Sequence, residues 1–162
     1  MQVYIMRHGQ AEGFVKNDAQ RALTSQGIKE VSAMARWFRQ NKHDVDLVLV
    51  SPYVRAQQTA ATFCQSADIS LKPETVTFIT PSGSATDVHD YLDGVVAAEK
   101  YSSVLIVSHM PLVSYLVGEL TCEGHTPIFQ TGAIADINYD VKKMKGELVA
   151  LVSPVDIAHL AQ

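Results

Sequence analysis

Four residues that could act on an anion share one sequence context, because each follows a short, continuous apolar run. They are Arg7, His8, Arg55 and His109. A guanidinium group binds an oxyanion through two parallel hydrogen bonds and stays charged at physiological pH. A histidine can act as a nucleophile or as a proton donor near neutral pH. Brought together, the four side chains would form a pocket for a dianion, and a phosphoryl group fits that description best.

The chemistry expected in such a pocket is covalent phosphoryl transfer. A neutral histidine would attack phosphorus and form a phosphohistidine, while the arginines hold the equatorial oxygens as charge builds up. The second histidine, in its protonated form, would donate a hydrogen bond to a phosphoryl oxygen. Gly9 has no side chain, so the backbone there would turn sharply and pass close to the ligand. Water would then hydrolyse the intermediate and release phosphate.

Each of these residues also has an ordinary structural interpretation. A single histidine after a strand is usually a surface or hydrogen-bonded residue, and a lone arginine in a first helical turn is usually solvated or ion-paired. The functional interpretation therefore depends on all four occurring together. The remaining histidines lack this context and are expected on the surface; they are His43, His89, His125 and His159.

The sequence indicates neither a metal site nor a nucleotide site. The histidines do not have HExxH or comparable ligand spacing, and Arg7 beside His8 would repel a cation. The GxGxxG and Walker A patterns of nucleotide-binding loops are absent from the sequence. We therefore expect no metal and no cofactor.

Length and charge narrow the class of protein. A chain of 162 residues, about half of them apolar, suits one domain over residues 1–162. The net charge of −4 argues against the broad basic surface that nucleic-acid binding needs, so an anion site must be local. No signal-peptide pattern is present, and no apolar run approaches the ~20 residues that span a membrane. We expect a cytoplasmic protein that binds neither nucleic acid nor membrane.

The apolar pattern predicts strands and helices in alternation. Continuous apolar runs predict strands at residues 2–6, 47–50 and 104–107, with a weaker one at residues 75–79. Spacing of three and four predicts helices at residues 25–40, 52–66, 87–99 and 111–120.

Local signals add detail to these elements. Thr24 is placed to cap the first helix, and Ser51 the second, with Pro52 at its first helical position. Residues 9–24 form a long polar loop, of the kind that is often functional. Residues 133–139 and 147–152, joined by a basic turn, are typical of a hairpin.

Together these elements predict an α/β fold in three layers. A mainly parallel central sheet would carry helices on both faces and end in a C-terminal hairpin. Ligands of such sheets bind beyond the carboxyl ends of the strands. The two arginines and two histidines should therefore meet at one rim. Helices beginning near Pro52 and Pro111 would add backbone N–H groups and positive dipole ends there.

Three segments together resemble the histidine phosphatase superfamily, also called phosphoglycerate-mutase-like. They are residues 7–9 (RHG), 51–59 (SPYVRAQQT) and 108–111 (SHMP). Residues 23–27 (LTSQG) are similar to the segment that opens the first helix in that family. The short chain and residues 133–135 (AIA) most resemble its small bacterial members, the SixA-type phosphohistidine phosphatases.

The resemblance implies a role for each of the four residues. His8 would be the nucleophile, and the other three would bind the phosphoryl group. The substrate would be a phosphohistidine on another protein, with histidine phosphotransfer domains of bacterial two-component relays as the expected partners and inorganic phosphate as the product. Larger members carry insertions that roof the pocket, and this chain has little room for one.

The chain departs from the family pattern at the general acid. Many members have a glutamate just after the third strand, whereas residues 76–80 (VTFIT) contain no carboxylate. An alkoxide leaves poorly without a proton, but the imidazole of phosphohistidine can be protonated near neutral pH and then leaves readily. The missing acid therefore favours P–N over P–O cleavage.

Two residues of the long loop are further candidates. Asp18 could be a substitute acid or a substrate contact, and equally a solvated carboxylate paired with Arg21 or Lys16. Arg21 could reach the phosphoryl group or the partner protein. Two other functions stay open: a phosphomonoesterase or mutase acting on a small phosphate ester, and a non-catalytic module that binds and shields phosphohistidine.

Overall fold

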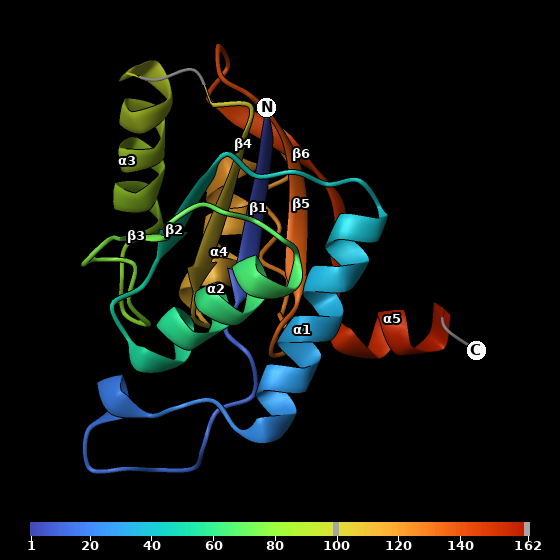
Figure 1. Ribbon diagram of the computed structural model, residues 1–162. Helices are drawn as coiled ribbons and strands as arrows, with labels where there is room; N and C mark the ends of the chain where they lie inside the picture. The colour runs from blue at the N-terminus through green and yellow to red at the C-terminus, as the bar shows by residue number, and fades with distance from the viewer. Residues whose placement is uncertain (99–100, 161–162) are drawn as a thin grey trace.

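The computed structural model describes residues 1–98 and 101–160, which form a six-stranded sheet between two layers of helices (Figure 1). The strands are β1 (Gln2–Arg7), β2 (Leu47–Val50), β3 (Glu74–Thr75), β4 (Ser103–Ser108), β5 (Ile134–Asp140) and β6 (Lys145–Val152). Their order across the sheet is β3-β2-β4-β1-β5-β6. The first four strands are parallel, and β5 and β6 form an antiparallel hairpin, which confirms the predicted sheet.

The helices cover both faces of this sheet, as predicted. They are α1 (Ser25–Gln40), α2 (Val54–Ser66), α3 (Ala85–Ala98), α4 (Leu112–Leu120) and α5 (Pro154–Leu160), with a short 3-10 helix, η1 (Asp18–Gln20). One face packs against α1 and α2, with α5 beside α1, and the other packs against α3 and α4.

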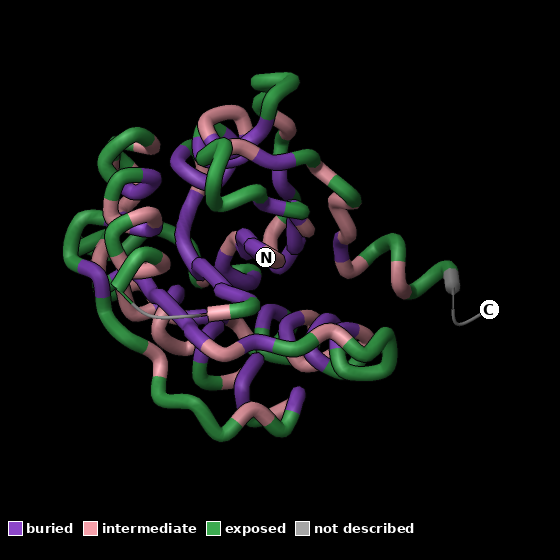
Figure 2. The backbone as a smooth tube through the Cα atoms, turned by 90° about the horizontal axis from the view of Figure 1, so that it is seen from above, coloured by how far each residue is buried: buried purple, intermediate pink, exposed green. Residues whose placement is uncertain are grey.

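Alternating side chains of the central strands build the two cores. Val3 and Ile5 of β1 pack toward α3 and α4, whereas Tyr4 and Met6 pack toward α1 and α2. Figure 2 shows this buried interior enclosed by exposed outer segments. Burying a large apolar side chain contributes about 1.5–3 kcal/mol, so a strand buried on both faces holds the sheet firmly in place.

The start of α1 supports the segment that follows His8. The Oγ1 atom of Thr24 accepts a hydrogen bond of 3.0 Å from the N–H of Gly27, which confirms the predicted cap. A Cβ atom on Gly27 would lie 2.1 Å from the carbonyl oxygen of Gln10. The glycine is therefore required because helix and loop backbones touch at this point.

The start of α2 differs from the prediction. The helix begins at Val54, with Tyr53 as its N-cap and no side-chain capping bond, instead of at Pro52 with Ser51 as the cap. Tyr53 has extended backbone angles, so the helical turn starts later than the proline suggested. The hydroxyl of Ser51 hydrogen-bonds elsewhere, as described below.

The strand predicted at residues 75–79 is mostly a turn. Regular pairing stops at Thr75, although the N–H of Val76 still donates to the carbonyl of Val50 at 2.9 Å. Val76 and Ile79 are buried, so their apolar character reflects core packing from a turn and not a longer strand.

Further comparisons with the prediction concern the end of one helix, two helices that were not predicted and one histidine. The helix predicted to end at Glu99 is described up to Ala98, and Glu99 lies outside the described residues. Neither η1 nor α5 was predicted. His89 is buried and hydrogen-bonds Tyr139 and Glu119, so its predicted surface position was wrong.

No helix within residues 1–98 and 101–160 is long and apolar enough to cross a membrane.

Substituting alanine for two helical glycines should give opposite changes in stability. Gly27→Ala should lower the free energy of unfolding by about 1–3 kcal/mol, because its Cβ would clash with the Gln10 backbone. Gly94→Ala in α3 is the control: nothing lies within 4 Å of the added Cβ, so the higher helix propensity of alanine should stabilise the fold by up to about 1 kcal/mol. Urea unfolding of both variants measures the difference, and equal effects would contradict the contact.

Candidate active site

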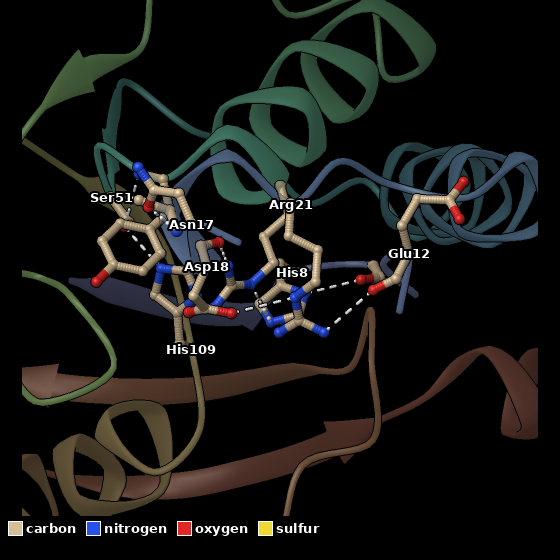
Figure 3. A network of polar contacts seen from close by, with 11 residues as sticks. His8, Glu12, Asn17, Asp18, Arg21, Ser51 and His109 are labelled. Carbon is tan, nitrogen blue, oxygen red and sulfur yellow. Dashed lines mark hydrogen bonds and ion pairs between the residues drawn. The ribbon is translucent and has the colours of Figure 1, made fainter. Parts of the chain in front are cut away.

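The carboxyl ends of β1, β4 and β2 lie side by side and bring the four predicted residues together. Arg7 is in register with Ser108, and Val50 with Val107, so the residues after these strands share one edge. The Nε atom of Arg55 lies 3.2 Å from Nε2 of His8. The ring centroids of His8 and His109 are 5.1 Å apart, and Figure 3 shows the resulting polar network.

His8 is fixed through one ring nitrogen and is 5% exposed. Its Nδ1 atom lies 2.7 Å from the carbonyl oxygen of Gly9, which can only accept, so the hydrogen-bond network places the proton on Nδ1. Nε2 therefore carries the lone pair, which accepts from the Arg55 Nε–H. Burial lowers the pKa of His8 to about 4, the Gly9 hydrogen bond opposes this shift, and the charges of Arg55 and Arg7 add to it. The imidazole is neutral at physiological pH, as a nucleophile requires.

Gly9 supports the site through its backbone. Its φ angle is not in the left-handed region, so backbone conformation alone does not require a glycine here. A Cβ atom at this position would lie 2.7 Å from Cγ2 of Val31 in α1, which explains the glycine. Its N–H donates to Oγ1 of Thr59 at 3.0 Å, and that hydroxyl donates to the carbonyl of Arg55 at 2.7 Å. The backbones that carry His8 and Arg55 are thereby linked.

Asp18 ties the long loop to Arg55. The guanidinium of Arg55 donates to the Asp18 carbonyl at 2.8 Å and to its Oδ2 at 3.1 Å. Arg21 donates from Nε to Asp18 Oδ1 at 3.2 Å, so the predicted Asp18–Arg21 pair is present. Both carboxylate oxygens of Asp18 thus accept from arginines (Figure 3). Asp18 would have to leave one of them to transfer a proton.

Arg7 gives the pocket a buried cationic group. Its NH1 donates to the carbonyl of Phe129 at 2.7 Å, and its Nε is buried without a hydrogen-bond partner among the described residues. Burial lowers the pKa of Arg7, and the charges of Arg21 and Arg55 lower it further. Three guanidinium groups therefore repel one another here, and a bound dianion would relieve that repulsion.

His109 is neutral in the unliganded protein, in contrast to the protonated form that the sequence suggested. Burial lowers its pKa to about 2, and the neighbouring His8 and Arg55 contribute to the shift. Nε2 of His109 lies 2.7 Å from Oγ of Ser51, and Nδ1 is buried with no partner within residues 1–98 and 101–160. A neutral imidazole still offers one N–H donor to a ligand.

Sequence reasoning missed some of the residues around the four. Tyr53 packs its ring 5.0 Å from that of His109, with the guanidinium of Arg55 5.1 Å from the ring centroid. Ser51 contacts His109, although its position before a proline indicated a helix cap. The signal that could have identified Ser51 is its place at the end of a predicted strand. Only the order of strands in the sheet reveals that this strand neighbours the one before His109.

Metal binding finds no support in the described part of the chain. No group of three or more histidine, cysteine, aspartate or glutamate residues there could hold a metal ion.

The chain is similar in sequence to a known protein family and to two of its named members. Residues 3–76 match the model of the histidine phosphatase superfamily (branch 1). The phosphohistidine phosphatase SixA of Escherichia coli is 42% identical over 141 residues, which cover 86% of each chain. A SixA homolog of Haemophilus influenzae is 40% identical over 162 residues, covering 96% of this chain and 98% of the other.

A solved structure supports the same relation. The structure of the protein histidine phosphatase SixA complexed with tungstate superposes with a TM-score of 0.92 at 37% sequence identity. The match covers 97% of this chain and 99% of the other. At this coverage the similarity extends over nearly the whole chain.

The low pKa of His8 should be visible in a titration. We expect His8 to stay neutral down to about pH 4, well below the ordinary histidine value of 6.5. Between these values the unfolded chain binds more protons than the folded one, so stability should fall as the pH drops from 6.5 toward 4, by about 1–3 kcal/mol for this group. NMR of histidine-labelled protein, with His8→Gln to assign the signal, measures the titration. A midpoint near 6.5 would contradict the burial argument.

Proposed function

The chain belongs to the histidine phosphatase superfamily, and on that basis we propose that it is a protein phosphohistidine phosphatase. The observation that carries the proposal is the state of His8. Its Nδ1 is held 2.7 Å from the Gly9 carbonyl, and its neutral Nε2 lies 3.2 Å from Nε of a buried arginine, Arg55. A neutral imidazole fixed among guanidinium groups is suited to attack an anionic phosphorus.

The first step transfers the phosphoryl group to the enzyme. Nε2 of His8 attacks phosphorus, the P–N bond to the substrate imidazole breaks, and the leaving ring nitrogen takes up a proton. Before this step Arg55 Nε must leave the His8 lone pair, and it can then bind a phosphoryl oxygen instead. Arg7 and Arg21 add positive charge, and His109 donates a hydrogen bond as charge builds up on the oxygens.

The second step restores the enzyme. Water attacks the phosphorus of phospho-His8, the bond to Nε2 breaks, and inorganic phosphate leaves. The neutral imidazole returns to the state seen in the structure, with Nδ1 still held by Gly9. No metal or cofactor takes part in either step of this proposal.

The leaving group explains how the reaction proceeds without a dedicated glutamate. Imidazole has a pKa near 6.5, so water can protonate the leaving nitrogen, whereas an alkoxide would need a strong acid at hand. Asp18 is the carboxylate that reaches the site in the described residues, and both its oxygens bind arginines. We propose that Asp18 holds Arg55 and Arg21 in place and that water supplies the proton.

The partner that we propose is a phosphohistidine protein, of which a histidine phosphotransfer domain of a bacterial relay is the expected case. Support for a protein substrate comes from two relatives named as phosphohistidine phosphatases, which align over most of the chain. A single catalytic domain over residues 1–162 and the cytoplasmic location expected from the sequence are part of this proposal.

Two exposed large apolar side chains, in chain segments that contact the site, agree with a protein substrate. Phe14 is 96% exposed and lies in the loop that Asp18 fastens to the site. Ile128 is 83% exposed and precedes Phe129, whose carbonyl binds Arg7. Exposed aromatic and aliphatic residues next to a site often contribute to a protein interface.

Loss of the nucleophile should abolish turnover. His8→Ala should reduce phosphate release from a phosphorylated phosphotransfer domain by about 10³-fold or more, and it should remove the acid-labile label on the enzyme. Rapid-quench labelling and phosphate release measure the two effects.

Two comparisons make this test specific. His125→Ala, at an exposed loop histidine, is the matched control and should keep normal rates. A generic aryl phosphate and sugar phosphates test the alternative of a small-ester phosphatase or mutase. Faster turnover of these esters than of the phosphoprotein would reject our proposal, and so would full turnover in His8→Ala. Binding without release of phosphate would instead indicate a phosphohistidine-shielding module.

Substitution of the exposed apolar residues should weaken the reaction with protein substrates and leave the reaction with small substrates unchanged. Phe14→Ser or Ile128→Ser should raise the KM for the phosphoprotein about 10-fold, because each change removes apolar contact area at the interface. The rate on a small phosphoramidate should not change. Val141→Ser is the control, because Val141 is exposed and follows β5 at the end of the sheet opposite His8. Equal losses on both substrates would argue against a docking role.

A further inference from the structure

Ser51 is fully buried at the carboxyl end of β2, and its Oγ lies 2.7 Å from Nε2 of His109 (Figure 3). Several contacts hold it there. Its N–H donates to the carbonyl of Val107 at 3.1 Å, which joins the ends of β2 and β4. Its carbonyl accepts from Nε2 of Gln57 at 2.7 Å, and its Oγ accepts from the N–H of Tyr53 at 3.3 Å. Both the backbone and the hydroxyl of Ser51 are therefore fixed.

The direction of the bond to His109 follows from counting donors and acceptors. Among the described residues, His109 Nε2 is the acceptor within reach of the Ser51 hydroxyl proton. If Nε2–H donated instead, the hydroxyl proton and the lone pair on Nδ1 would both be buried without partners, which is costly. The arrangement that satisfies more groups has Ser51 donating to Nε2. The proton of a neutral His109 is then on Nδ1.

This assignment accounts for the buried Nδ1 atom of His109. As an N–H donor in a ring packed against His8, it is ready to bind an oxygen of a phosphoryl group. The opposite tautomer would present a lone pair to the same oxygen and repel it. The side chain that selects the tautomer therefore decides whether His109 attracts the ligand.

We propose that Ser51 is a positioning residue that keeps the His109 proton on Nδ1, where it is donated to the phosphoryl group. The role matters because burial lowers the pKa of His109 to about 2, so the unliganded ring has a single proton to place. The inference rests on the proposed function for its kinetic test, whereas its structural test needs no substrate.

The tautomer can be read directly in the wild-type protein. In ¹⁵N NMR of histidine-labelled enzyme without ligand, we expect the His109 Nδ1 atom to carry the proton and Nε2 to be bare. Addition of inorganic phosphate should then change the chemical shift of the His109 Nδ1–H group more than that of Nε2. A proton on Nε2 in the free enzyme would overturn the proposal, whatever the substrate of the enzyme.

Variants test whether the hydroxyl is responsible. Ser51→Ala should show a mixture of the two His109 tautomers, raise the inhibition constant of inorganic phosphate about 10-fold and lower kcat/KM by a similar factor. Ser51→Thr keeps a hydroxyl at this position and should recover most of the loss. If Ser51→Ala keeps the wild-type tautomer and phosphate affinity, Ser51 does not have the proposed role.

The neighbouring strand end provides a matched control. Ser108 is equally buried, and its hydroxyl donates to the carbonyl of Ile79 at 2.8 Å, away from the His109 ring. Ser108→Ala should leave the His109 tautomer unchanged. The inhibition constant of inorganic phosphate should stay within about 2-fold of the wild-type value. Equal losses in Ser51→Ala and Ser108→Ala would mean general loosening of the strand ends, and the specific role would fail. Absence of phosphate release by the wild-type enzyme would instead refute the proposed function and leave the NMR result standing.

Discussion

Parallel pairing of β1 with β4 and of β4 with β2 is the constraint on which the site depends. The three strands end at the same level, so the residues after them meet although they are far apart in the sequence. Because these strands are buried on both faces, a shift in register would expose apolar side chains of both cores. The stability of the sheet therefore fixes the relative positions of His8, Ser51 and His109.

Neighbouring groups in the site partly offset the electrostatic repulsion between its arginines. Arg7 and Arg55 are held by carbonyl groups and by Asp18, yet they still repel one another. Burial lowers the pKa of His8 and of His109, and the charges of the two arginines add to that shift. The same arrangement keeps His8 neutral and gives an incoming dianion a favourable field. Stability and catalysis thus make opposite demands on these charges, and ligand binding would relieve the repulsion between them.

The site is held by backbone groups as much as by side chains. The carbonyl of Gly9 orients His8, the carbonyl of Phe129 orients Arg7, and the carbonyl of Asp18 orients Arg55. Gly9 and Gly27 let the chain after His8 lie directly against α1, so the loop that carries Asp18 starts from a rigid point.

The sequence by itself determined the alternation of strands and helices, the central strands and the four residues expected at the rim, because apolar periodicity and short motifs are local properties. It did not determine where α2 begins, that residues 76–79 form a turn, or that His89 is buried, because packing overrides local signals there. It also gave Ser51 the role of a helix cap, since serine before proline has that meaning locally. Only the tertiary structure, by placing β2 next to β4, showed that the hydroxyl of Ser51 faces His109, because the order of strands in a sheet depends on contacts between distant segments.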